Sequence, residues 1–513
     1  MNKRGLIYNS NIYDILSIFL LFIVTLIFFF KFRVHYNEMD VIPFAKAFFN
    51  NHWLDKDWYL NLYIPYRFFF SYPVGFFTDS FGIMQTIILG RLFSYFLMSY
   101  ALHSLIKSIS CSINMFLYHF AIIVFYCFFP NGNGAGEWMV GGLDTKVFAY
   151  VFSIFSLTSF INKRYLKGFF FAGLVLNFHV LIGIFHLFSI LPFLFFFQKN
   201  NINFLKEFTS FITVFCLSGF FGLYCIFYQL FFPEQEASNI AWNIYVNVRV
   251  PHHTLPSFFP VQLWIKMILF SVFNLYIIYR IKTGKIRLLA FYAVSSVLIS
   301  LVGLIIFFSS LENHYLRYYF FRFSDVMLPL ITLLNIIILF TKYYSKFIHK
   351  YISRIKLVLV SIFFLIFFKP FNSFCNDFTI NIKDIIYSDS LDLNMHDWIR
   401  SNTDQESVFI TCPDDHFFYI NCERSMFVSW KHSPQNSADI IFWYNRLKHL
   451  NSNKEFSNIE EIVDNYYKLK KDEILLIADK YPDVDYFLTS NLIHLDLPVA
   501  YQSNNLVLYK IVK

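Results

Sequence analysis

The chain has 513 residues, of which 57% are hydrophobic, and its mean hydropathy is +0.49. A soluble protein of this length would not bury so much apolar surface, so the composition predicts a chain that spans a lipid bilayer. The net charge is +8, but the basic residues lie in short loops and form no basic stripe or recognition motif, which argues against nucleic-acid binding.

Apolar stretches recur through the first 370 residues, with lengths that suit membrane-spanning helices. We predict spans near residues 11–31, 83–105, 113–130, 144–161, 167–179, 181–197, 207–231, 262–279, 288–309, 326–341 and 355–369. Two structures fit the stretch 167–197: a short helix, a turn near His179 and a second helix, or one long re-entrant pair.

About 11 spans and a cytoplasmic N-terminus would place the C-terminal region outside the cytoplasm. The basic residues of the first 370 positions agree, because most of them lie in the loops predicted to face the cytoplasm. They are Lys3, Arg4, Lys107, Lys163, Arg164, Lys167, Lys199, Lys206, Arg280, Lys282, Lys285, Arg287, Lys342, Lys346, Lys350, Arg354 and Lys356. The opposite loops carry eleven acids: Glu38, Asp40, Asp55, Asp57, Asp79, Glu137, Asp144, Glu234, Glu236, Glu312 and Asp325.

The first outer loop, residues 32–82, is long and is predicted to contain amphipathic helices at the membrane surface. It holds Glu38, Asp40 and Asp57. A carboxylate here can accept a proton from an incoming hydroxyl, or hold a divalent cation such as Mg²⁺ or Mn²⁺. The competing interpretation is that a loop at a membrane surface contains acids because it is hydrated.

Further candidates follow along the chain. The stretch GEWMVGGLDTK places Glu137, Asp144 and Lys146 at the start of a span, where they would bind substrate or where Asp144 and Lys146 would pair with each other. Its glycines would let a ligand approach closely, or only form the turn. His179 lies within an apolar run, where a histidine faces a polar cavity or bonds to a neighbouring helix.

The run RVPHHTLP holds Arg249, His252 and His253. We expect the two histidines of this Pro-flanked, extended segment to point in different directions, which argues against a metal site built from them alone. Arg317 and Arg322 lie at the outer end of a span, where their guanidinium groups suit a phosphate or pyrophosphate. The alternative is that they extend to lipid headgroups.

From residue 370 onward the long apolar runs stop. The runs SVFITCP, SMFVSW, DYFLTS and LVLYKIV are typical of strands and alternate with helical stretches, and VAYQ with LVLYKIV predicts a terminal hairpin. We therefore predict a transmembrane domain over 1–369 and a small extracytoplasmic α/β domain over 370–513. In that compartment Cys412 and Cys422 either form a disulfide or stay as thiols.

Several stretches resemble the GT-C superfamily of membrane glycosyltransferases, specifically a bacterial branch of GT-C-like proteins. They are GGLDTKVFAYVFSIFSL with GLVLNFHVLIG, then RVPHH, then DWIRSNTDQESVFITCPDD with ERSMFVSWK. The resemblance covers most of the chain. It implies a multi-pass protein of the bacterial inner (plasma) membrane that transfers a sugar, with inversion, from a polyprenyl-phosphate donor to an extracytoplasmic acceptor.

By position, the resemblance makes Glu38 or Asp40 the general base and gives Asp57 a supporting role. Arg317 and Arg322 would hold the donor phosphate. The other predicted substrate-binding residues are Glu137, Asp144, Lys146, His179, Arg249, His252 and His253. Met39 separates Glu38 from Asp40, so the paired acids of the family are missing, the identity of the base stays open and no metal is required.

Two rival functions remain. A flippase or transporter for a lipid-linked glycan would place ionisable groups near the bilayer midplane, often beside broken helices, whereas the acids here cluster at one end of the spans. A polysaccharide polymerase or ligase would differ from the transferase in its acceptor rather than in its chemistry.

Overall fold

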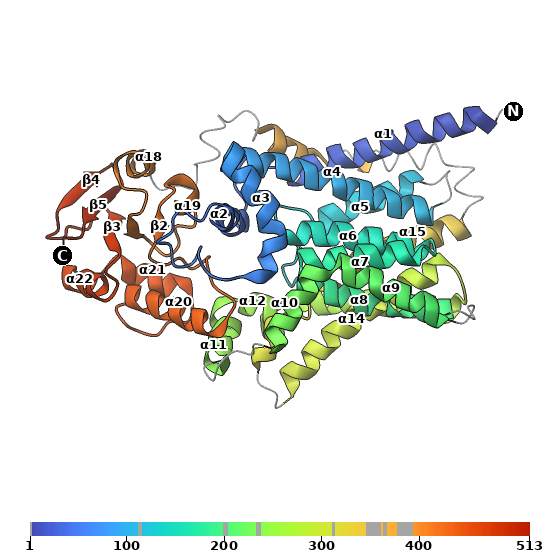
Figure 1. Cartoon of the computed structure of the whole chain (residues 1–513). Coiled ribbons are helices and arrows are strands. Elements are labelled where there is room, and N and C mark those ends of the chain that lie inside the picture. The colour runs from blue at the N-terminus through green and yellow to red at the C-terminus, as the bar shows by residue number, and fades with distance from the viewer. Residues whose placement is uncertain are drawn as a thin grey trace. The chain divides into compact units, whose positions relative to one another are not determined.

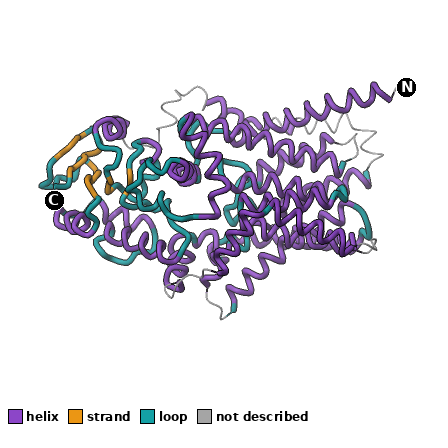
Figure 2. The backbone as a smooth tube through the Cα atoms, viewed as in Figure 1, coloured by secondary structure: helices purple, strands orange, loops and turns teal. Residues whose placement is uncertain are grey.

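The computed structural model of the chain describes residues 3–110, 115–198, 204–231, 238–309, 313–344, 361–362, 367–376 and 393–512. These residues are mostly helical, and their strands, orange in Figure 2, all lie between residues 408 and 510. The chain divides into two compact units. A helical unit comprises residues 1–31, 90–230 and 252–379, and a mixed unit comprises 32–89, 231–251 and 380–513. The units alternate along the sequence, whereas the predicted domains 1–369 and 370–513 are contiguous.

The helical unit is built from apolar helices that pack side by side. Helix α6 packs on α7, α7 on α9, and α14 on α8 and α15, as Figure 1 shows. The helices are α1 (Lys3–Phe29), most of α4 (Ile83–Ile109), α5 (Met115–Phe128), α6 (Thr145–Ile161), α7 (Tyr165–Phe178), α8 (Val180–Gln198), α9 (Phe204–Ser218), α10 (Phe220–Phe231), α12 (Pro251–Thr254), α13 (Val261–Arg280), α14 (Lys285–Phe308) and α15 (Arg322–Tyr343).

Some of these helices are long and apolar enough to cross a membrane. In the described part of the chain these are four, Ile12–Phe29, Val261–Arg280, Lys285–Phe308 and Arg322–Tyr343, and the pair α9–α10 would be a fifth. That pair bends by 83°, so a single span over 207–231, as predicted, would be a broken span rather than a continuous helix. Helices α5 to α8 are apolar but shorter. The predicted span 355–369 lies largely outside the described residues, and the total of about 11 spans stays a prediction.

The bend between α9 and α10 is stabilised by one side chain of α7. In a continuous helix the N–H of Gly222 would donate to the carbonyl of Ser218. Here Asn177 inserts between them: its Nδ2 donates to Ser218 O at 2.7 Å, and its Oδ1 accepts from Gly222 N at 3.0 Å. Helix α7 itself ends at Phe178 and α8 begins at Val180, so the chain turns at His179, the first of the two structures predicted for 167–197.

The mixed unit contains a five-stranded sheet in the order β2-β1-β3-β5-β4. Strand β1 pairs in parallel with β2 and β3, and β5 pairs antiparallel with β3 and β4, which confirms the predicted terminal hairpin. The elements are α2 (Glu38–Phe49), α3 (Phe68–Phe81), α11 (Ser238–Ile244), a π-helical turn (Tyr245–Arg249), α18 (Leu393–Asn402), β1 (Val408–Ile410), α19 (Phe418–Asn421), β2 (Ser425–Met426), α20 (Ser437–Leu450), α21 (Ile459–Tyr466), α22 (Lys471–Lys480), β3 (Val484–Ser490), β4 (Val499–Gln502) and β5 (Leu506–Lys510).

Both faces of this sheet are buried. Side chains alternate along β5, so Val507 belongs to a core with Trp443 of α20, whereas Leu508 belongs to a second core with Phe418 of α19. The second core also contains Phe44 of α2 and Tyr59. The segment predicted as the first outer loop is therefore part of the hydrophobic core of the mixed unit. This packing holds the acidic residues of the segment in defined positions.

The two cysteines of the mixed unit are thiols. Cys412 and Cys422 are both free, so the disulfide option is not realised. Burial raises the pKa of the Cys412 thiol to about 11, which keeps it protonated at neutral pH.

Candidate functional site

A shielded ion pair joins Asp40 of α2 to Arg67. Arg67 donates from Nη2 to Asp40 Oδ2 at 2.8 Å and from Nη1 to Oδ1 at 3.1 Å, and Tyr59 donates its hydroxyl to the same Oδ1 at 2.6 Å. Burial alone would raise the pKa of Asp40, but the charge and hydrogen bonds of Arg67 outweigh it and hold this pKa at about 2. Asp40 is thus a fixed carboxylate, and a base role requires Arg67 to loosen its contact.

Glu38, the second predicted catalytic acid, lies at the start of α2. Its side chain is fully buried, and its Oε2 accepts a hydrogen bond from the N–H of His35 at 2.7 Å. A carboxylate in the first turn also interacts favourably with the helix dipole. These contacts indicate that Glu38 stabilises the N-terminus of α2.

Asp57, the third predicted catalytic acid, is buried and accepts four hydrogen bonds. Its Oδ1 accepts from the N–H groups of Tyr59 at 3.0 Å and Leu60 at 2.9 Å. Its Oδ2 accepts from the hydroxyl of Tyr419 at 2.7 Å and from the N–H of Met426 at 3.0 Å. Burial raises the pKa of Asp57, although these bonds oppose it. The carboxylate has little remaining capacity to accept hydrogen bonds from a substrate. Its contacts connect the segment predicted as the first outer loop to residues 419–426 of the mixed unit.

A histidine from the C-terminal region lies against the same part of α2. His432 donates from Nε2 to the carbonyl of Met39 at 3.0 Å, and its ring lies 5.3 Å from that of Tyr59 and 4.7 Å from that of Tyr419. Its Nδ1 is buried and accepts no hydrogen bond from the described residues. Burial lowers the pKa of His432 to about 4, so the ring is neutral at pH 7.

Two cations adjoin the start of α2. Lys431 donates from Nζ to Asn37 Oδ1 at 2.9 Å, and its Nζ lies 3.7 Å from the centre of the Tyr36 ring. Arg249, predicted to bind substrate, donates from Nη2 to the carbonyl of Lys431 at 3.4 Å and lies over the ring of Trp430. Asp40, Arg67, Tyr59 and His432, which we name the Asp40 cluster, are therefore flanked by positive charge.

In the helical unit, a glycine-rich loop surrounds the carboxylate of Asp325 at the start of α15. Asp325 Oδ1 accepts from the N–H groups of Asn133 at 2.8 Å and Ala135 at 3.1 Å, and Oδ2 accepts from the N–H of Glu137 at 3.2 Å. Successive backbone N–H groups that point inward form a concave site for a negative charge. In this loop the concave site is filled by the Asp325 carboxyl group of the protein itself.

The glycines of this loop are required by its geometry. Gly132, Gly134 and Gly136 have φ values of +71°, +151° and +73°, which residues with a side chain rarely adopt. A Cβ atom on Gly132 would also lie 2.1 Å from Asp325 Oδ2. Of these three, only Gly136 belongs to the stretch GEWMVGGLDTK, and its positive φ fits the turn-forming role, the second of the two roles predicted for the glycines there.

The loop brings Glu137 to two cations. Glu137 Oε2 lies 3.6 Å from Lys146 Nζ and 3.4 Å from Arg322 Nε, and Tyr150 donates its hydroxyl to Oε1 at 3.4 Å. Glu137 and Lys146 are 1% and 6% exposed. The ion pairs are longer than ideal charged hydrogen bonds, and Oε2 accepts no hydrogen bond from the described residues. A buried carboxylate with unused acceptor capacity is a candidate for ligand contact.

The histidines near this loop lie on a short helix, α12. His253 donates from Nδ1 to the carbonyl of Ala135 at 2.9 Å, and burial together with the charge of Arg322 lowers the pKa of His253 to about 2. The rings of His252 and His253 are 4.1 Å apart, so the prediction that they point in different directions is wrong. The reason is that the segment is helical rather than extended.

The remaining predicted residues make contacts of their own. Asp144 accepts from the hydroxyl of Thr145 at 3.0 Å, while Lys146 pairs with Glu137 rather than only with Asp144. His179 accepts from the N–H of Ile182 at 3.4 Å. Arg317 contacts the ring and hydroxyl of its neighbour Tyr318. Arg249 belongs to the mixed unit, apart from the other predicted substrate-binding residues.

Three chain segments thus meet in the helical unit, and Glu137, Lys146, Arg322 and His253 form what we name the Glu137 cluster. The sequence analysis missed Asp325 as an organiser of this cluster, although glycines at every second position of GNGAG signal a turn of inward-pointing amides. It also missed Arg67, Tyr59 and His432, for which no local signal exists. Within the described part of the chain, no group of three or more His, Cys, Asp or Glu side chains is arranged to hold a metal ion.

Together the fold and the two clusters define a mostly helical protein with apolar helices, buried charged groups and a small α/β sheet. A family model described as "Domain of unknown function (DUF6798)" matches residues 392–450. The matched segment runs from α18 to the end of α20 and includes Tyr419, Met426 and His432, which contact the first-loop segment. No curated protein sequence matches the chain.

Proposed function

We propose that the protein is a multi-pass membrane glycosyltransferase of the GT-C type, which moves a sugar from a polyprenyl-phosphate donor to an extracytoplasmic acceptor. The observation that carries this proposal is the Glu137 cluster. Two cations, Lys146 and Arg322, each in the first turn of an apolar helix, converge there on the buried Glu137 carboxylate, and the neutral ring of His253 contacts the same loop. Such a group of cations beside apolar helices suits a ligand with a charged phosphate and a long lipid chain.

The apolar surface of the helical unit supports the membrane part of the proposal. Helix α13 exposes a row of large hydrophobic side chains: Ile265, Ile268, Leu269, Val272 and Leu275. Exposed apolar surface of this extent is stable against lipid but not in water. We propose that the unit inserts into a bacterial inner membrane with about 11 spans, the N-terminus in the cytoplasm and the α/β region outside it.

The donor phosphate would bind to Lys146 and Arg322 and would displace Glu137 from them. The planar guanidinium of Arg322 can bind two phosphate oxygens at once, whereas the Lys146 ammonium acts as a point charge. As the bond between the anomeric carbon and the phosphate oxygen breaks, the leaving phosphate gains negative charge. Fixed cations in a site of low dielectric stabilise that charge most effectively.

The base of the reaction is proposed to be Asp40. Glu38 is fully buried and Asp57 accepts four hydrogen bonds, whereas the Asp40 side chain is 13% exposed. In an inverting transfer the acceptor oxygen attacks the anomeric carbon, its proton passes to the carboxylate, and the bonding electron pair leaves with the phosphate. Asp40 is ionised at neutral pH, and it becomes an effective base only when Arg67 loosens its contact and its pKa rises from about 2.

The bend between α9 and α10 favours a second candidate, a flippase or transporter for a lipid-linked glycan, because such proteins bind substrates beside broken helices. However, the contacts of the bend come from Asn177 and Gly173, neither of which is ionisable. Glu137, Lys146 and Arg322, by contrast, are ionisable and lie together in the Glu137 cluster. We therefore place the transferase first.

Mass spectrometry of lipid-linked and surface glycans in a deletion strain tests this proposal. The strain is complemented with wild type, Asp40→Asn, Arg322→Gln, or the control Asp55→Asn, which changes an exposed acid of the same segment. We expect wild type and the control to restore a glycan that lacks one sugar in the deletion strain, and the other two variants to fail at normal protein levels. A complete lipid-linked glycan that accumulates on the inner leaflet would instead establish a flippase.

A further inference from the structure

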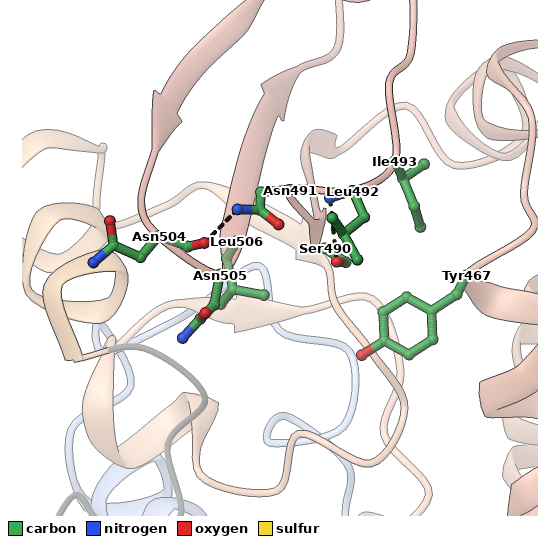
Figure 3. Close-up of a pocket in the computed structure, with 8 residues that line it drawn as sticks. All are labelled: Tyr467, Ser490, Asn491, Leu492, Ile493, Asn504, Asn505 and Leu506. Carbon is green, nitrogen blue, oxygen red and sulfur yellow. Dashed lines mark hydrogen bonds between the residues drawn. The ribbon is translucent and has the colours of Figure 1, made fainter.

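A groove of about 720 Å³ lies in the mixed unit where the end of β3 meets the β4–β5 turn (Figure 3). Its lining residues share one property, which is that none of them carries a charge. They are Tyr467, Ser490, Asn491, Leu492, Ile493, Asn504, Asn505 and Leu506. The volume falls within the range of about 300–1,000 Å³ that is usual for small-molecule sites.

Hydrogen bonds among its lining residues hold the groove in place: two join the loop after β3 to the turn before β5, and one lies within that loop. Asn491 donates from its backbone N–H to the carbonyl of Asn505 at 3.0 Å, and its side-chain amide donates to the carbonyl of Asn504. The N–H of Leu492 donates to Ser490 Oγ at 3.3 Å. The groove therefore exists before any ligand binds.

The lining presents both polar and apolar groups to a ligand. Asn504 and Asn505 are exposed, and Leu492 is 84% exposed at the rim. Figure 3 shows the Tyr467 ring on one side of the groove and the asparagines on the other. Each asparagine amide offers two donors and an acceptor in one plane, while the ring and the leucine offer flat apolar contact.

We propose that this groove binds an uncharged oligosaccharide. Neighbouring hydroxyl groups of a sugar ring both donate and accept, which matches the amides, and its C–H face matches the tyrosine ring and Leu492. An anionic ligand would gain no charge partner from this lining. If the proposed transferase function holds, the ligand is the acceptor glycan, and the groove keeps that glycan near the protein between transfer events.

Binding is tested on the full-length protein in lipid nanodiscs by saturation-transfer NMR and calorimetry. The neutral probes are maltotetraose, chitotetraose and mannotetraose. Two comparison ligands are tested beside them: the anionic tetragalacturonate and an unstructured Gly-Ser peptide. We expect at least one neutral probe to bind, and the double variant Asn504→Ala, Asn505→Ala to weaken it about fivefold or more. The control Gln502→Ala removes an exposed amide of the same hairpin outside the groove and should leave binding unchanged.

Several outcomes would overturn the assignment. They are no binding of any neutral probe at about 10 mM, equal binding by wild type and the double variant, or binding of only the anionic or peptide probe. Thermal unfolding of the double variant checks that the hairpin remains folded. We expect Asp40→Asn to bind the probes as wild type does. Failure of the transferase proposal in the glycan assay therefore does not change the result of this binding test. Conversely, if sugar transfer is observed but the double variant binds the probes as wild type does, the groove proposal is rejected and the transferase proposal stands.

Discussion

Tyr419 donates its hydroxyl to Asp57 Oδ2 at 2.7 Å, a bond between residues 362 positions apart in the sequence. Tyr419 belongs to the segment that the family model matches, and Asp57 belongs to the segment predicted as the first outer loop. The N–H of Met426, from the same matched segment, donates to the same oxygen. The matched segment therefore buries its polar groups against a partner that lies far upstream in the same chain.

The first prediction concerns Asp57. Asp57→Asn should lower the free energy of unfolding of the mixed unit by about 2–4 kcal/mol, because an amide NH₂ would then face groups that all donate. Tyr419→Phe removes one donor and should cost about 1–2 kcal/mol. Chemical unfolding monitored by tryptophan fluorescence measures both effects. Their sum should exceed the effect of the double variant, and strict additivity would show that the two groups are not coupled.

A second prediction concerns pH and His432. The pKa of His432 in the folded protein is about 4, below its ordinary value of 6.5, so the unfolded chain binds this proton more tightly. The contribution of His432 to the free energy of unfolding should be greatest above pH 6.5 and should fall by about 3 kcal/mol between pH 6.5 and pH 4. Unfolding measured across this range should show less slope in His432→Gln, and unchanged slope in His52→Gln, an exposed histidine.

The charged and titratable groups around His432 also affect its pKa and so bear on how that test is interpreted. Asp40 favours the charged ring, whereas His416 and Lys431 disfavour it. Asp40, with its pKa lowered to about 2, contributes stability that is lost only as pH falls from about 4 toward 2, outside the histidine range. A His432→Gln variant with the same slope as wild type would mean that another group dominates between pH 4 and 6.5.

The glycine loop allows a matched comparison of two substitutions. Gly132→Ala should destabilise the protein by at least about 2 kcal/mol more than Gly284→Ala. Both glycines have positive φ, at +71° and +102°, but a Cβ on Gly132 would meet Asp325 Oδ2 at 2.1 Å, whereas one on Gly284 meets nothing within 4 Å. Thermal unfolding in detergent compares them. Equal effects would show that the carboxylate moves aside and that only the backbone angle matters.

The inserted amide of Asn177 can be removed without a large change in volume. Asn177→Leu should leave Ser218 O and Gly222 N without their partner and should lower the free energy of unfolding by about 2–4 kcal/mol. Hydrogen exchange at the Gly222 amide should also become at least about tenfold faster. The control Gln229→Leu changes an exposed amide of α10 and should alter neither quantity. Slow exchange in the variant would indicate that α9 and α10 rejoin as one helix.

Much of the fold follows from local sequence patterns. The alternation of LVLYK and the short VAYQ run predict the terminal hairpin, and the break near His179 is one of two structures predicted for its stretch. The bend at Gly219 is not predicted, because glycine also occurs within helices and the run SFITVFCLSGFFGLYCIFYQL reads as one apolar span. The bend depends on Asn177, which lies 41 residues before the carbonyl it contacts.

The candidate site was predictable only in part, for the same reason. The sequence places Glu137, Lys146 and Arg322 at the outer ends of predicted spans, but it does not predict that they pair with one another. Arg67 lies 27 residues from Asp40, and His432 lies 393 residues from Met39. Contacts at such separations are decided by tertiary packing, and no spacing rule in a single sequence reports them.

The shared core of the mixed unit has a consequence for biosynthesis. Phe44 and Tyr59 leave the ribosome long before Leu508, with which they share a hydrophobic cluster. At ordinary elongation rates this delay is on the order of tens of seconds. During that time the sheet on which α2 and its neighbours pack has not yet been synthesised. Most of the helical unit is synthesised in this interval. The core shared by α2 and β5 therefore forms late, after β5 has been synthesised, and we expect a chaperone that shields residues 32–89 to raise the yield of folded protein.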